Sequence, residues 1–184
     1  MAAQLIVLGA LALLLLWAIY TYNRLVVLRN RIDNAWHQIA VQLRRRFDLI
    51  PNLEETVKGY ASHERTTFEQ VTKARAAAEA ATNLGEQAAA QNMITAALRG
   101  LLAVAENYPE LKANQNFLAL QEELTATEDR IAYARQAYND TVMMFNALMQ
   151  MFPANIVASL GSFQRRDYFE LEDRAAEQPV KVDF

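Results

Sequence analysis

The sequence predicts an all-α protein in which an N-terminal transmembrane helix is continuous with an elongated antiparallel four-helix bundle. The N-terminus carries a long apolar run without charge, and apolar residues then recur at intervals of three and four along most of the chain. Only 5 Gly and 4 Pro occur among 184 residues, whereas Ala, Leu, Gln and Glu are abundant. The chain has no cysteine, which excludes disulfides, thiolate metal clusters and a cysteine nucleophile.

The apolar run at residues 5–22 predicts a membrane span. It contains no formal charge, and about 20 helical residues suffice to cross a hydrocarbon core of about 30 Å. Aromatic residues gather at its C-terminal end, where amphipathic rings favour the headgroup region. A cleaved signal peptide is the alternative, but it requires basic residues before the run and small residues at a cleavage site, and neither is present. We therefore expect an uncleaved anchor.

The charge distribution predicts the orientation of this span. Residues 1–46 contain six basic residues and one acidic residue, whereas residues 47–184 contain twelve basic and twenty acidic residues. Arginines follow the span at once and none precedes it, so the positive-inside rule places the N-terminus outside and residues 23–184 in the cytoplasm. Arginines beside the bilayer also attract anionic lipid. The predicted membrane-interface residues are Trp17, Tyr20, Tyr22, Arg24, Arg29 and Arg31.

The hydrophobic periodicity predicts several helices after the span. They cover residues 24–60, without a linker from the span, then 62–81, 86–106, 110–152, 154–160 and 165–177. Pro51 predicts a kink or a short break in the first, and Ser62 is the expected N-cap of the second. We expect the two long helices to lie side by side, with 62–81 and 86–106 completing the bundle. The predicted domains are the anchor 1–22, the bundle 23–160, and a C-terminal polar helix and tail 161–184.

A search for catalytic motifs is negative. His63 begins a zincin-like pattern, but Thr67 stands where the second zinc-ligating His is required. Neither His37 nor His63 follows a Glu at the spacing of di-iron bundles. Phosphate-binding loops, dinucleotide fingerprints and serine nucleophile elbows are absent from the sequence. We therefore predict no catalytic residue, no metal and no cofactor, and a protein that is not an enzyme.

The run Arg44-Arg45-Arg46 has two interpretations. It can pair with Glu122, Glu123 or Glu128 on the neighbouring long helix, or it can form part of a nucleic-acid surface. The rest of the cytoplasmic part is acidic, which favours helix pairing and no nucleic-acid partner.

Several stretches together resemble the LemA family of bacterial membrane proteins. They read YNRLVVLRNRIDNAWHQIAVQLRRRFDLIPNLEETVKGYASHE at 22–64, ENYPELKANQNFLALQEELTATEDRIAYARQAYNDTVMMFN at 106–146, FPANIVA at 152–158 and VKVDF at 180–184. The resemblance implies a single-pass protein of the bacterial cytoplasmic (inner) membrane with an outside N-terminus and a cytoplasmic helical bundle. It implies no enzymatic activity.

The predicted function is a non-enzymatic membrane scaffold that self-assembles through its long helices and organises membrane or membrane-associated partners. A thin bundle has difficulty hiding all of its aromatic residues, so some would face other copies, and repeated side contacts close into a ring. The alternative for the aromatics is that they all fill the monomer core. The alternative function is a membrane-tethered adaptor that binds one protein partner as a monomer or dimer. The expected partners are anionic lipid, further copies of the chain and an unidentified membrane protein. The candidate helix-pairing or assembly residues are Trp36, Arg44, Arg45, Arg46, Phe47, Tyr138 and Phe145.

Overall fold

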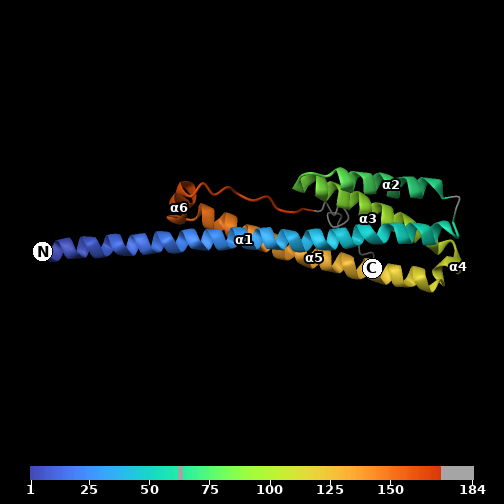
Figure 1. Cartoon of the computed structure of the whole chain (residues 1–184), viewed down its shortest axis with the longest axis horizontal. Helices are drawn as coiled ribbons and strands as arrows, with labels where there is room; N and C mark the ends of the chain where they lie inside the picture. Colours follow the sequence, from blue (N-terminus) through green and yellow to red (C-terminus); the bar gives the residue numbers. More distant parts are fainter. Residues whose placement is uncertain (62–63, 171–184) are drawn as a thin grey trace, which may run out of the picture. The chain divides into compact units, whose positions relative to one another are not determined.

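The computed structural model describes residues 1–61 and 64–170, and every regular element in these ranges is a helix. The predicted all-α fold class is therefore confirmed. In chain order the helices are α1 (Ala2–Lys58), α2 (Arg65–Ala80), α3 (Leu84–Glu106), α4 (Pro109–Lys112), α5 (Gln115–Gln150) and α6 (Ala154–Leu160) (Figure 1).

Helix α1 joins the apolar N-terminal run to the rest of the chain without a linker, as predicted. It also runs without interruption through Pro51, so the predicted break is absent. Proline removes one backbone donor from a helix interior. The side chains around it, Ile50, Leu53 and Val57, are all buried in the core. Burial of this apolar face on both sides of the proline keeps the chain helical.

The predicted helix 110–152 is instead two helices, because the side chain of Asn114 starts a new one. Asn114 Oδ1 accepts hydrogen bonds from the backbone N–H groups of Asn116 at 2.8 Å and Phe117 at 3.2 Å. Asparagine is a strong N-cap because its side chain satisfies donors that have no partner inside the helix. The chain therefore ends α4 and begins α5 at Gln115, where periodicity alone predicted continuity.

The side chains of Asn83 and Glu86 cap the N-terminus of α3. Asn83 Oδ1 accepts from the Glu86 N–H at 2.9 Å, and the Glu86 carboxylate accepts from the N–H and hydroxyl of Thr82. These hydrogen bonds, that from the Thr82 backbone above all, lower the pKa of Glu86. The cap starts α3 at Leu84, slightly earlier than predicted. For α2 the predicted cap Ser62 lies outside the described residues, and the helix begins at Arg65.

The chain divides into two compact units. Unit 1 comprises residues 1–41 and 131–168, and unit 2 comprises residues 42–130 and 169–184. In unit 2, α2 packs against α3, and the core also draws apolar side chains from α1, α4 and α5. That core includes Ile50, Leu53, Val57, Phe68, Val71, Ile94, Leu98, Leu101, Leu111, Phe117 and Leu124. The antiparallel four-helix arrangement stays a prediction.

In unit 1 the last part of α5 lies against the stretch of α1 that follows the apolar run, with the two helices running in opposite directions, and the apolar run projects beyond them (Figure 1). The ring of Trp36 on α1 packs against that of Tyr138 on α5. Nearer the apolar run, the rings of Tyr22 on α1 and Phe145 on α5 both pack against Phe163. Buried aliphatic and aromatic side chains fill the space between them, among them Leu25, Ile32, Ile39, Val142 and Phe145.

The prediction of a polar helix over 165–177 is wrong for residues 165–170, the part of it that the structure describes. Residues 163–168, which we call the strap, have no regular structure, and residues 171–184 lie outside the described residues. The Phe163 N–H donates to the Ala158 carbonyl of α6 at 3.0 Å, and side chains of α5 bind the strap's backbone at Arg166 and Asp167. Asn146 Oδ1 accepts from the Arg166 N–H at 3.0 Å, Asn146 Nδ2 donates to the Arg166 carbonyl at 2.8 Å, and the Tyr138 hydroxyl donates to the Asp167 carbonyl. The strap therefore has no need of helical hydrogen bonds.

The cap of α5 yields a test. Asn114→Ala removes the N-cap bonds and the hydrogen bond from Asn114 Nδ2 to the Tyr60 hydroxyl. We expect it to lower the free energy of unfolding by about 0.5–2 kcal/mol, the usual effect of losing an N-cap. Urea unfolding of the full chain in detergent, followed by circular dichroism, measures the change. Asn116→Ala is the matched control, since Asn116 is exposed in the first turn of α5. An equal loss in both variants would contradict the capping role.

Candidate functional site

Phe163, the first residue of the strap, joins the end of the apolar run to the end of α5. Its ring lies 5.5 Å from that of Tyr22 and 6.2 Å from that of Phe145, both edge-on. The Arg29 guanidinium lies 5.6 Å from the ring centroid of Phe163. Edge-on aromatic pairs and cation–π contacts each contribute about 0.5–1.5 kcal/mol beyond burial. A predicted membrane-interface tyrosine and arginine thus share one partner.

Gly161 makes this junction possible. A Cβ at position 161 would lie 2.6 Å from Cε2 of Phe163 and 3.1 Å from Cε2 of Tyr22. A side chain at position 161 would force the ring of Phe163 to shift, so the absence of a Cβ allows the turn after α6 to approach these two rings closely.

A second set of contacts fastens the strap further along α1. Arg166 Nη2 lies 2.8 Å from Oδ1 of Asp33, which is the one acidic residue among residues 1–46. Both side chains are half-exposed, so this ion pair contributes at most about 1 kcal/mol. Nearby, the rings of Trp36 and Tyr138 lie 6.0 Å apart. The Tyr138 hydroxyl is buried against the strap, and burial raises its pKa.

The predicted membrane-interface residues are all exposed. They are Trp17, Tyr20, Tyr22, Arg24, Arg29 and Arg31. In the described part of the chain, α1 and α3 are each long and apolar enough to cross a membrane, and α5 with α6 passes only as one bent pair. The apolar window of α1 is not buried by protein at all, whereas half of the α3 window is buried, with Ile94, Leu98 and Leu101 in the core. The α1 run is therefore the candidate span, and α3 is a core helix.

The three adjacent arginines of unit 2 have three different environments. Arg44 pairs with Asp48 one turn along the same helix, at 3.1 Å. Arg45 forms an ion pair with Glu123, and Arg46 forms one with Glu128 at 2.9 Å. Two of the three thus meet carboxylates of α5 that the sequence offered as partners.

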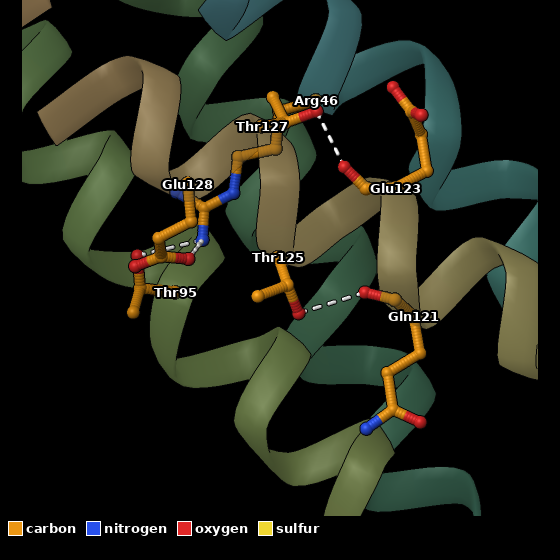
Figure 2. Close-up of polar contacts among 7 residues, drawn as sticks. All are labelled: Arg46, Thr95, Gln121, Glu123, Thr125, Thr127 and Glu128. Carbon is orange, nitrogen blue, oxygen red and sulfur yellow. Dashed lines mark hydrogen bonds and ion pairs between the residues drawn. The ribbon is translucent and has the colours of Figure 1, made fainter. Parts of the chain in front are cut away.

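Arg46 differs from its neighbours because it is 2% exposed. Figure 2 shows its guanidinium beside Glu128 and Thr95, with Nη2 at 2.9 Å from Oε2 of Glu128 and 3.0 Å from Oγ1 of Thr95. Its Nε has no hydrogen-bond partner. Burial lowers the pKa of Arg46, Glu128 raises it, and nearby Arg99 lowers it further. One buried cation therefore links α1, α3 and α5.

The α5 backbone beside this cation carries two threonines that bond their own helix. The hydroxyl of Thr127, which is fully buried, donates to the Glu123 carbonyl at 2.7 Å, and that of Thr125 donates to the Gln121 carbonyl at 2.9 Å (Figure 2). For the buried Thr127 this bond satisfies a hydroxyl that water cannot reach, whereas Thr125 is exposed.

The predicted assembly aromatics make contacts within one chain. Tyr138 and Phe145 are buried, and Trp36 and Phe47 are half-buried. The guanidiniums of Arg44 and Arg75 lie 5.7 and 5.0 Å from the ring centroid of Phe47. The monomer-core interpretation accounts for these four residues.

Other apolar side chains are exposed in unit 1, and the sequence analysis did not single them out. On the two long helices they are Val27, Val41, Tyr133, Met143 and Met144, and at the α5–α6 corner they are Met151, Phe152, Ile156 and Leu160. The sequence did contain a sign of their exposure, because Val27 and Val41 fall outside the apolar stripe by which α1 contributes to the core.

The described residues contain no group of three or more His, Cys, Asp or Glu side chains that could hold a metal ion. His37 is exposed on α1, and His63 lies outside the described residues. Over the described ranges the geometry therefore presents packing and ion pairs rather than a set of reactive groups.

Comparison with known proteins gives a consistent family. The family model of the LemA family matches residues 35–184. The chain is 24% identical to "Magnetosome protein MamQ 2" of Paramagnetospirillum magneticum over 185 residues, which covers 86% of this chain and 68% of that protein. "Magnetosome protein MamQ" of Magnetospirillum gryphiswaldense matches with the same identity and coverage. "Protein LemA" of Metamycoplasma hominis is 26% identical over 165 residues, covering 88% of this chain and 72% of that protein.

The buried ion pair predicts an asymmetry between its two partners. Removing Glu128 leaves the buried guanidinium of Arg46 without its ion-pair partner, whereas removing Arg46 leaves a half-exposed carboxylate that water can reach. Because the Glu128 side chain is 52% exposed, we expect Glu128→Ala to cost about 2 kcal/mol of unfolding free energy. Arg46→Met should cost less, since the remaining carboxylate can be hydrated. Chemical denaturation measures both, with exposed Glu122→Ala of the same helix as control. A larger loss for Arg46→Met than for Glu128→Ala would contradict the account.

Tyr138 predicts a loss of stability in alkaline solution. Its folded-state pKa is raised above the ordinary value of 10.0, so its contribution is fully present below pH 10 and is lost as pH rises through the folded-state pKa. Tyr138→Phe cannot ionise, but it loses the hydrogen bond to the Asp167 carbonyl. We therefore expect the parent chain to be more stable than Tyr138→Phe at pH 7 and this advantage to shrink above pH 10. Melting curves across that range test this, with exposed Tyr133→Phe as control. An advantage that stays constant with pH would rule out the titration of Tyr138.

Proposed function

The chain belongs to the LemA family, and on that premise we propose that it is a non-enzymatic, single-pass scaffold of the bacterial cytoplasmic (inner) membrane. In this proposal it self-assembles through its long helices and organises membrane or membrane-associated partners. One observation carries the proposal: α1 joins an apolar run that no protein covers to a helical unit whose two long helices leave large apolar side chains exposed.

Membrane insertion of the apolar run follows from its exposure. Side chains such as Leu8, Leu13 and Leu16 are more than half exposed, and no part of the apolar window is buried inside the chain. Removing that much apolar surface from water is strongly favourable. A helix also satisfies its own backbone hydrogen bonds in lipid. The arginines that follow support an outside N-terminus, a cytoplasmic remainder and contact with anionic lipid.

Self-assembly is supported by the exposed faces of unit 1. Tyr20, Val27, Asn34 and Val41 follow one another at seven-residue spacing on α1 and are all exposed, so they share one face of the helix. On α5, Tyr133 is 77% exposed, and Met143 and Met144 lie on the outer surface of the same helix. Exposed apolar surface of this kind marks protein contact sites.

A membrane fixes one direction for every copy, which favours closed rings. Copies that share one orientation in a bilayer and use the same two flanks are related by rotation about the membrane normal. The similar proteins named as magnetosome proteins carry the name of a cellular structure rather than of a reaction, which supports a structural role.

Particle mass tests this function. The full-length chain in a mild detergent or in nanodiscs of phosphatidylethanolamine and phosphatidylglycerol is measured by light scattering over a dilution series. A single large species that persists on dilution supports the scaffold. A monomer or dimer at every concentration would contradict self-assembly and favour the adaptor for one protein partner, which cross-linking in membranes would then identify.

Substitution of the exposed faces gives a sharper form of the test. Val41→Glu and Tyr133→Glu each place a charge on the predicted contact surface, where burial of an unpaired carboxylate is strongly unfavourable. We expect each variant to reduce the particle mass while circular dichroism and the melting temperature stay unchanged. Asn52→Glu and Gln121→Glu are the controls, because they add the same charge at exposed polar positions of the same helices in unit 2, outside the proposed faces. An unchanged particle mass in Val41→Glu and Tyr133→Glu would exclude these faces from assembly.

A further inference from the structure

The corner between α5 and α6 exposes large apolar side chains at a regular spacing. Phe152, Ile156 and Leu160 follow one another at intervals of four residues, and Met151 lies beside them. Phe152 is 81% exposed and Leu160 is 83% exposed. The opposite side of α6 carries Ala154 and Ala158, which are buried in unit 1. Helix α6 is therefore amphipathic, with its larger apolar residues pointing away from the protein.

This corner lies beside the end of the candidate span. A Cβ at position 161 would lie 3.1 Å from Cε2 of Tyr22, so the turn after α6 is in close contact with Tyr22, and the ring of Phe163 packs on that of Tyr22. A helix of seven residues such as Ala154–Leu160 is about 10 Å long at 1.5 Å per residue. Because the turn after α6 contacts Tyr22, all of α6 lies within roughly one such length of the residue where the apolar run ends.

The direction of α6 suits the surface of a bilayer. It makes an angle of 97° with α5, and the part of α5 in unit 1 runs antiparallel to α1. A helix nearly perpendicular to a membrane-crossing helix lies close to the membrane plane. Its exposed stripe can then enter the lipid along its full length.

The charges around the corner also favour contact with a lipid bilayer. Residues 141–164 contain no Asp, Glu, Lys, Arg or His, and the first charged residues after them are Arg165 and Arg166. On α1, Arg24, Arg29 and Arg31 follow the span, and Arg29 stacks on Phe163. An apolar stripe bordered by arginines complements an anionic leaflet, where apolar residues reach the acyl boundary and guanidiniums meet phosphate.

We propose that α6 and the preceding corner form a second membrane contact, in which Phe152, Ile156 and Leu160 enter the cytoplasmic leaflet beside the α1 span. This inference rests on the proposed membrane insertion of α1. Interfacial helices bury their apolar face about 5–10 Å into the headgroup and acyl boundary. Two contacts on one leaflet, joined through Tyr22, Gly161 and Phe163, hold unit 1 in one orientation against the membrane surface.

Depth-dependent quenching tests the proposal. The chain has 2 Trp, so Trp17→Phe with Trp36→Phe gives a background without tryptophan. Phe152→Trp and Leu160→Trp are added singly to it, and the full-length proteins are placed in phosphatidylethanolamine–phosphatidylglycerol vesicles with or without brominated acyl chains. We expect blue-shifted emission that loses a large share of its intensity in the brominated vesicles. Tyr133→Trp, an exposed position on α5, is the control and should not be quenched.

Each result has a defined meaning. Emission that is solvent-like and unquenched at both positions overturns the proposal. Blue-shifted emission without quenching also overturns it, because the stripe is then covered by a second copy or another protein. A chain that keeps only Trp17 reports separately on the span, so quenching of Trp17 without quenching at 152 and 160 rejects the second contact while membrane insertion of α1 stands.

If the tryptophan-free background does not fold, spin labelling replaces it. The chain has no cysteine, so Leu160→Cys can be labelled alone with both tryptophans retained. Contact with lipid predicts that oxygen, which concentrates in the bilayer, relaxes the label more effectively than a water-soluble nickel chelate. The opposite ranking overturns the proposal.

Discussion

The constraint on which the rest depends is that burial of the apolar run at residues 5–22 away from water is strongly favourable, while no described part of the chain covers it. Because the same helix continues to Lys58 without a linker, residues on its N-terminal half acquire defined levels relative to a membrane. Tyr22 marks the end of the run, and the contacts of Phe163 place the turn after α6 at the same level. With the proposed insertion of the run, the membrane surface becomes part of the environment of unit 1.

Polar side chains decide where the helices end and how they are joined. Asn146 binds both backbone groups of Arg166 and Tyr138 binds the next carbonyl, which holds the strap against α5 without helix or strand. In unit 2 the buried guanidinium of Arg46 meets a partly hydrated carboxylate and one hydroxyl. Such groups add little net stability, but each is costly to leave unpaired, so alternative packings are disfavoured.

Much of this fold was predictable, because long apolar stripes report helices directly. The continuity of α1 follows from that signal, whereas the bounds of α6 follow from Pro153 before it and Gly161 after it. The carboxylate partners of Arg45 and Arg46 were identifiable by charge. The break before α5 was missed since a single Asn114 side chain outweighs the periodicity around it. The strap was predicted as a helix because its partners, Asn146 and Tyr138, are remote in sequence. Tyr138 and Phe145 are buried, whereas Val41 and Tyr133 are exposed. Which residues are buried depends on which faces of α1 and α5 pack together, and the periodicity of the sequence does not specify this.

Labelling from the two sides of the membrane tests the central claim most directly. The chain lacks cysteine, so Ala2→Cys and Gln136→Cys introduce one thiol each at exposed positions before and after the span. Intact cells are treated with a membrane-impermeant maleimide before and after permeabilisation. The account predicts labelling of Ala2→Cys in intact cells and of Gln136→Cys only after permeabilisation. Labelling of both thiols from the same side, or of Gln136→Cys alone in intact cells, would contradict it.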